Sequence, residues 1–181
     1  MTQKPIKIAI ISDLHVMAPE LLVNEGSAFE EYLAKDRKML RESLEILDTL
    51  VNSILELKPD LVLVTGDLTK DGERLSHQLV AAQLQRLIDA GIQVLVVPGN
   101  HDINNPDAKV FDGDSATPAD TITRAEFAEI YHNMGYDVIV RFRKSRKVIF
   151  RNLGFVAGCQ CLVIGGICKN APFIQNPGWP S

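Results

Sequence analysis

Three short apolar runs, each rich in β-branched side chains, constrain the fold of this 181-residue chain more than any other feature. The runs cover residues 6–12, 61–64 and 92–97, and stretches with apolar residues at helical spacing separate them. Strands that are apolar throughout are typical of a parallel sheet covered on both faces. Their alternation with helices predicts an α/β fold, a parallel-type sheet with flanking helices joined by right-handed crossovers.

The stretches between and after these runs predict three helices. Asp36 is placed to cap the first of them, and Thr123 and Glu126 have the spacing of a capping box at the start of the third. Loops are expected at about 15–35 and 103–120, and loops of that length are often functional. The helices are expected at residues 36–57, 73–90 and 121–134.

Each apolar run leads directly into a polar cluster. The clusters are Ser12-Asp13-Leu14-His15, Thr65-Gly66-Asp67 and Pro98-Gly99-Asn100-His101-Asp102. Ligand sites in open α/β sheets form outside the carboxyl ends of the strands. The predicted fold therefore gathers one set of side chains on a single rim: Asp13, His15, Asp67, Asn100 and His101.

These residue types suit a metal site. Carboxylate, imidazole and carboxamide groups are ligands for divalent metals such as Mn, Fe or Zn. One carboxylate such as Asp67 can bridge two cations at the roughly 3.5–4 Å spacing of two-metal sites. His101 can reach the substrate side of the metals, and Asp102 is placed to hold its tautomer. Any one cluster alone is typical of a turn or a cap, but all three in order, each after an apolar strand, favour a metal site.

The three clusters resemble the first motifs of the calcineurin-like metallophosphoesterases, which are Asp-x-His, Gly-Asp and Gly-Asn-His-Asp/Glu. The resemblance covers about residues 6–137. It implies that Asp13 and His15 bind one metal. It also implies that Asp67 bridges both metals and that Asn100 binds the second.

The same resemblance implies a reaction. It is metal-dependent hydrolysis of a phosphodiester or a phosphomonoester, by in-line attack of a metal-bound hydroxide. His101 would stabilise the transition state or protonate the leaving oxygen. The implied cofactors are two divalent ions, and the implied substrate is a small-molecule phosphoester.

The remaining histidines, His77 and His132, lie in predicted helices, and we expect them on helix surfaces or at caps. The family's later ligands lie in Gly-His and Gly-His-x-His motifs, which this sequence does not contain. The second metal would then keep only Asp67 and Asn100. We therefore expect reduced metal occupancy and little or no turnover by this chain alone.

The sequence changes character after Asp137. Residues 138–181 contain Lys and Arg but no Asp or Glu, in an apolar, Gly- and Cys-containing context. We expect the N-terminal half of a calcineurin-like phosphoesterase domain at 6–137 and an atypical basic and apolar tail at 138–181, with the second half of the fold missing. Truncation with a frame shift is the explanation we favour. Two others stay open: a short paralogue whose basic tail recruits a partner, and a second polypeptide that supplies the missing ligands.

Composition and short motifs argue against several other classes of protein. No apolar run approaches the roughly 18 residues that span a bilayer, and no Gly-x-Gly-x-x-Gly follows the first strand. The N-terminus lacks the pattern of a signal peptide, which predicts a cytoplasmic protein. The three cysteines, Cys159, Cys161 and Cys168, do not complete a tetrahedral metal site, and we interpret them as apolar filler.

One rival function remains open. In this alternative, the chain is a non-catalytic paralogue with a vestigial metal site, and its basic tail binds a partner or nucleic acid. The aromatic residues of the tail are scattered without the spacing of a nucleic-acid-binding module, which disfavours nucleic acid. We expect no membrane partner.

Overall fold

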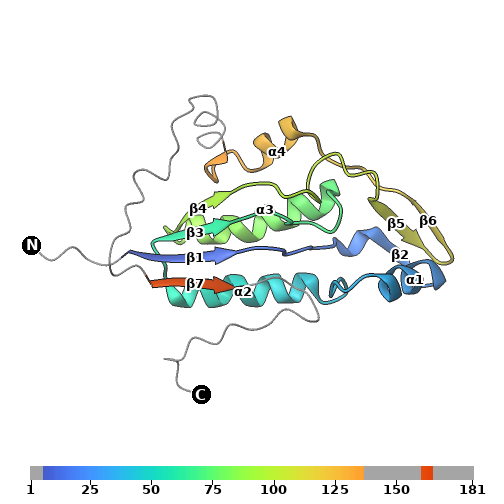
Figure 1. The fold of residues 1–181 in the computed structure, drawn as a ribbon, viewed down its shortest axis with the longest axis horizontal. Helices are drawn as coiled ribbons and strands as arrows, with labels where there is room; N and C mark the ends of the chain where they lie inside the picture. The colour runs from blue at the N-terminus through green and yellow to red at the C-terminus, as the bar shows by residue number, and fades with distance from the viewer. Residues whose placement is uncertain (1–5, 137–159, 165–181) are drawn as a thin grey trace, which may run out of the picture.

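The computed structural model of the chain describes residues 6–136 and 160–164, and its centre is a four-stranded parallel sheet. The strands are β1 (Lys7–Ile11), β3 (Leu61–Val64), β4 (Gln93–Val96) and β7 (Gln160–Ile164). Their order across the sheet is β4-β3-β1-β7 (Figure 1). Val62 pairs with Ala9 on one side and with Val94 on the other, so all three apolar runs lie side by side. The predicted α/β fold is confirmed.

Two long helices cover one face of this sheet. They are α2 (Ser43–Leu57), which connects β1 to β3, and α3 (Arg74–Asp89), which connects β3 to β4. Both connections step in the same direction across the sheet, so right-handed crossovers place both helices on one face, where they pack together (Figure 1). Val62, Val64, Val94 and Val96 are buried, whereas Leu61, Leu63 and Leu95 between them are only half-buried. Among the residues that the structure describes, the second face of the sheet is thus covered less completely than the apolar runs predict.

The helix expected at 36–57 begins later than predicted, as α2 at Ser43, and a separate helix precedes it in the segment expected to be a loop. Helix α1 (Ser27–Lys35) ends at Asp36, whose N–H donates to the Tyr32 carbonyl at 3.1 Å. The Asp36 carboxylate then accepts from the Lys38 N–H at 3.0 Å, and α2 begins only at Ser43. Asp36 is therefore a C-cap rather than an N-cap. The apolar periodicity extends back to Leu40, before the start of α2, because Leu40 is buried in a second apolar cluster.

The two segments expected to be loops carry a second, smaller sheet. The first contains a 3-10 turn (Pro19–Leu21), strand β2 (Leu22–Asn24) and α1. The second contains the hairpin of β5 (Lys109–Asp112) and β6 (Ser115–Pro118), and β2 pairs with β5. Phe29 of α1 packs on Phe111 of β5, with ring centroids 5.0 Å apart, so this sheet has its own core.

The last helix of the continuous part, α4 (Arg124–Ile130), is shorter than expected but begins as the sequence predicts. Thr123 Oγ1 accepts from the Glu126 N–H at 3.3 Å, and the Glu126 carboxylate accepts from the Thr123 N–H at 2.7 Å. The capping box is therefore confirmed.

Strand β7 belongs to the segment 138–181 that the sequence marks as atypical. It pairs with the whole length of β1, from Lys7 opposite Gln160 to Ile11 opposite Ile164. Cys161 lies in this strand. The other expectations about the tail, including those for Cys159 and Cys168, concern residues outside the described part. Across 6–136 and 160–164, the structure contains no helix with the length and apolarity needed to cross a bilayer.

His77 departs from its expected place on a helix surface. It lies on the inner side of α3 and is fully buried. Its Nε2–H donates to the Asp102 carbonyl at 2.8 Å, and its Nδ1 lies 2.9 Å from the Tyr131 hydroxyl. Burial lowers the pKa of His77 from 6.5 to about 4, so the ring is neutral at pH 7. The prediction of a surface position is wrong for His77, because both of its ring nitrogens have polar partners in the protein interior. His132 is exposed, as expected.

This burial predicts a pH-dependent stability. Between pH 6.5 and about 4, His77 takes up a proton in the unfolded chain but not in the folded one, so the free energy of unfolding falls as the pH falls. By pH 5 the loss from this residue is roughly 2 kcal/mol. Urea unfolding at pH 7.5 and pH 5, with chelator present, would measure it.

The control is His77→Gln, whose amide N–H can still donate to the Asp102 carbonyl. We expect the variant to lose less stability than the wild type over this range. Equal losses in the two proteins would contradict the assignment to His77.

Candidate metal centre

The polar segments after β1 and β3 continue side by side beyond the ends of both strands. The Asp13 N–H donates to the Gly66 carbonyl at 3.2 Å, and the His15 N–H donates to the Asp67 carbonyl at 2.9 Å. These backbone contacts extend the pairing of the two strands into the loops. They place Asp13 and His15 beside Asp67, at the rim where the sequence predicts a site.

Three of the predicted site residues have a left-handed backbone. The φ angle is 56° at Asp13, 44° at His15 and 50° at Asp67. Residues other than glycine seldom adopt this conformation, and such residues concentrate at functional sites. Here the turns direct the three side chains into one space.

The turns after β3 and β4 touch each other through glycines. A Cβ on Gly66, which has φ 103°, would lie 2.6 Å from the Gly99 nitrogen. A Cβ on Gly99 would overlap both the nitrogen and the Oδ1 of Asp67. Neither position has room for a side chain. The close approach lets the His101 N–H donate to Asp67 Oδ1 at 3.2 Å, which ties the third polar cluster to the second.

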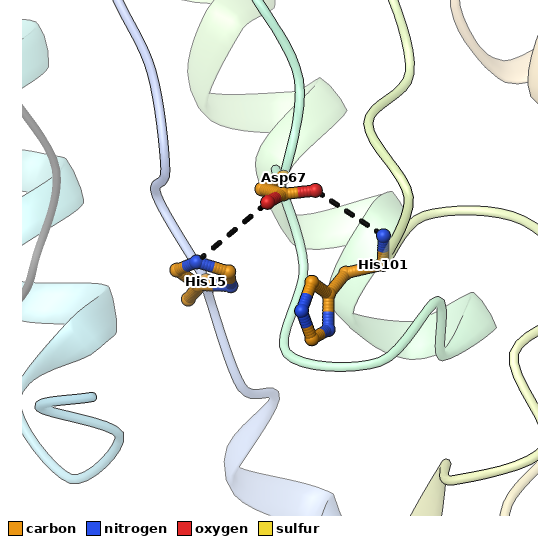
Figure 2. A group of neighbouring side chains, drawn as sticks. All are labelled: His15, Asp67 and His101. Atoms are coloured by element: carbon orange, nitrogen blue, oxygen red, sulfur yellow. Dashed lines mark hydrogen bonds and ion pairs between the residues drawn. The ribbon is translucent and has the colours of Figure 1, made fainter. Parts of the chain in front are cut away.

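His15, Asp67 and His101 form a compact group of candidate ligands, each with one ligand atom within 4.8 Å of the others (Figure 2). His15 Nε2 lies 4.0 Å from Asp67 Oδ2 and 4.0 Å from Asp13 Oδ1. These separations are too long for hydrogen bonds. Two ligands that each lie about 2.1 Å from one cation are separated by roughly 3–4 Å, so the spacing fits atoms that share an ion.

His15 itself fits the role of a ligand. It is buried, and its Nδ1 has no hydrogen-bond partner among the residues that the structure describes. Burial and the nearby Lys38 ammonium lower its pKa, so the ring is in the neutral form that binds metals. The donor set of two carboxylates and an imidazole suits a divalent cation such as Mn, Fe or Zn.

Asn100 lies on the loop between Gly99 and His101 and is exposed. This position is on the same rim as the group of His15, Asp67 and His101. The four residues predicted to bind metal, together with His101, thus come from three loops that follow β1, β3 and β4.

Asp71, rather than Asp102, faces the ring of His101. The Nδ1 of His101 lies 3.0 Å from Asp71 Oδ1, which requires the proton on Nδ1 because a carboxylate can only accept. Asp102 is fully buried and turned away: its carboxylate accepts from the N–H and hydroxyl of Thr69 and from the Gly99 N–H. This corrects the expectation that Asp102 holds the His101 tautomer. Asp102 instead fastens the loop after β4 to the loop after β3.

A buried charge cluster holds Asp71 in place. The ammonium of Lys70, which is fully buried, contacts the Asp71 carboxylate and also Glu73 Oε1 at 3.1 Å. The Tyr32 hydroxyl donates to Asp71 Oδ2 at 3.0 Å. Burial alone would raise the pKa of Asp71, but the charge and hydrogen bond of the Lys70 ammonium, together with the hydrogen bond from His101, hold it below its ordinary value. Asp71 is therefore a carboxylate at neutral pH.

Sequence reasoning missed Asp71 and Lys70. The sequence signal that could have found them is their position directly after Gly66-Asp67-Leu68-Thr69, close to the predicted ligand Asp67. A Lys and an Asp next to each other are usually solvated, so the pattern carries meaning only once their burial is known.

Comparison with known proteins points to one family. The family model of the calcineurin-like phosphoesterases matches residues 6–160. A 3',5'-cyclic-nucleotide phosphodiesterase of Nostoc sp. is 35% identical over 106 residues, which are 54% of this chain and 31% of the relative. A probable cyclic nucleotide phosphodiesterase of Fibrobacter succinogenes is 28% identical over 112 residues, 62% of this chain and 37% of the relative. The uncharacterized metallophosphoesterase YkuE of Bacillus subtilis is 37% identical over 60 residues, 33% of this chain and 21% of the relative.

The chain belongs to the calcineurin-like phosphoesterase family, a family of metal-dependent hydrolases. Its match to these three relatives spans 21% to 37% of their length. The family model also extends past residue 137, to the first residue of β7.

The glycine contact predicts a sensitive position. Gly99→Ala should push the loop after β4 away from Asp67, because the new methyl group overlaps Asp67 Oδ1. We expect Mn binding to weaken at least about tenfold and the unfolding free energy to drop by about 1–3 kcal/mol. Calorimetric titration with Mn and urea unfolding would measure the two effects.

Gly91→Ala serves as the control, because Gly91 has a φ of 82° but a Cβ there would meet nothing within 4 Å in the described part of the chain. Gly91→Ala adds backbone strain, which Gly99→Ala does not because Gly99 has no positive φ, and it lacks the overlap at the site. An effect on Mn binding in Gly99→Ala alone would therefore come from the overlap. Mn affinity that is unchanged in Gly99→Ala would contradict the importance of this contact.

Proposed function

We propose that this chain carries part of a metal-dependent phosphoester hydrolase whose metals lie at the rim of the sheet. Asp13 and His15 would bind one divalent cation, Asp67 would bridge it to a second, and Asn100 would bind that second ion. The observation that carries this proposal is the meeting of three strand ends, which groups His15, Asp67 and His101, with Asp13 Oδ1 4.0 Å from His15 Nε2. A pair of divalent cations, when bound, lowers the pKa of water and neutralises charge on phosphoryl oxygens.

His101 is proposed to act on the phosphoester itself. Its Nδ1–H donates to Asp71, so its Nε2 is the atom left to face a substrate. When the ring carries a second proton, Nε2–H can hydrogen-bond a phosphoryl oxygen or pass the proton to the leaving oxygen. The hydrogen bond to the Asp71 carboxylate fixes the orientation of the ring.

We propose a phosphodiester as the substrate, with cyclic nucleotides as the first candidates. Two of the relatives described above are named as cyclic nucleotide phosphodiesterases. We expect slow turnover at most from this chain, because the Gly-His and Gly-His-x-His motifs of the family are not in its sequence. Metal binding is for that reason the more sensitive test.

Asp67→Asn should remove metal binding, since an amide cannot bridge two cations as a carboxylate does. We expect the wild type to bind at least one Mn ion per chain by calorimetry and by metal analysis after gel filtration. The variant should bind none at the same concentration. Any Mn-dependent hydrolysis of bis(p-nitrophenyl) phosphate should disappear with it.

Asp89→Asn is the matched control, because Asp89 is an exposed carboxylate at the far end of α3. It should bind Mn as the wild type does. Wild-type protein that binds Mn no better than Asp67→Asn would overturn the proposed function.

A further inference from the structure

A cavity of about 490 Å³ opens directly beside the proposed metal centre. One wall belongs to His101 and Asp71, and the others come from α1, the segment after it, and the β5–β6 hairpin. The smaller sheet therefore forms the far side of this cavity. Two further cations, Lys35 of α1 and Lys109 of β5, belong to its lining.

Lys38 is a cation of this lining whose side chain is nearly buried. Its side chain is only 11% exposed. Its ammonium makes two contacts, one with Asp36 Oδ2 at 3.4 Å and one with the Lys70 carbonyl at 3.4 Å. An ammonium has three donors and its usual hydrogen bonds are near 2.9 Å, so both contacts are long and donor capacity is left over.

Lys38 lies on the same cavity as the catalytic histidine of the proposed site. It lines that cavity together with His101 and Asp71. Its ammonium contacts the carbonyl of Lys70, the residue that directly precedes Asp71. Lys38 therefore lies beside the loop that carries the partner of His101.

A nearly buried cation next to a site for divalent cations is unfavourable unless an anion lies between them. The two nearby carboxylates, Asp71 and Asp36, do not fully neutralise the charge of Lys38. Asp71 is already paired with Lys70, and Asp36 contacts the Lys38 ammonium only at 3.4 Å. A bound phosphoryl group has the charge, the size and the acceptor oxygens that this position lacks.

We propose that Lys38 binds a non-bridging oxygen of the phosphoryl group, and that the cavity beside His101 is the subsite in which the substrate lies. This inference rests on the proposed function and adds a phosphate-binding residue to it. The ammonium would then compensate phosphoryl charge on the side away from the metals. Lys35 and Lys109 line the same cavity, but Lys35 is exposed at the end of α1 and lacks the inward position of Lys38.

The test is calorimetric binding of phenylphosphonate, a non-hydrolysable phosphoryl dianion, to the Mn-loaded chain. Loss of one charge-assisted hydrogen bond should weaken binding about 10- to 100-fold in Lys38→Met. Lys38→Arg should restore most of the affinity, and Lys35→Met, the matched control, should change it less than about threefold. Mn affinity of Lys38→Met should stay the same or rise, because a positive charge is removed from the cavity beside the metal centre.

A loss of phenylphosphonate affinity without a loss of Mn affinity separates a binding role from general damage. Wild-type affinity for phenylphosphonate in Lys38→Met or, where that variant does not fold, in Lys38→Gln would overturn the inference and leave the proposed function intact. A Mn-loaded wild type that binds no phenylphosphonate would overturn both. Weaker binding of Mn and phenylphosphonate together in a folded Lys38→Met would overturn the inference as well, because it would show that Lys38 only supports the site's structure.

Discussion

The close contact between the turns after β3 and β4 is the feature on which the site depends. Parallel pairing sets the strands roughly 4.8 Å apart, but it does not by itself bring their loops together. The loops approach each other at Gly66 and Gly99, where the backbones are so close that a Cβ would not fit at either position. Asp102 fastens the same two loops from behind by accepting from Thr69 and Gly99, and His77 of α3 holds the Asp102 carbonyl. The rim is therefore fixed by buried hydrogen bonds that reach back to a helix of the core.

The smaller sheet takes part in the chemistry as well as in the fold. Tyr32 of α1 donates to Asp71, and the buried Lys70 ammonium lies 4.6 Å from the centre of the Tyr32 ring. These contacts connect the segment before α2 to the orientation of His101. Lys38, at the end of the same segment, faces the cavity beside that ring. The long connection between β1 and α2 thus supplies one side of the site, whereas the three strand ends supply the other.

The strands and the position of the rim could be predicted from the sequence because each polar cluster directly follows an apolar run. Periodicity placed the start of α2 too early, since Leu40 keeps the helical spacing but lies before Ser43 and is buried in a different cluster. Nor could spacing find the pairing of Asp71 with His101, because the two are brought together only by the contact of two loops. The burial of His77 was hidden for a similar reason, since its partners Asp102 and Tyr131 come from later parts of the chain. Strand β7 lies in a segment whose composition gave no sign of belonging to the sheet.

The central claim is that these strand ends form a metal centre around Asp67. The most direct test is a crystal structure of the chain grown with Mn, with anomalous differences measured above and below the Mn absorption edge. We expect a Mn peak within about 2.5 Å of His15 Nε2 and of a carboxylate oxygen of Asp67. Crystals with saturating Mn but no anomalous peak at this rim, or a peak held by other side chains, would contradict that claim.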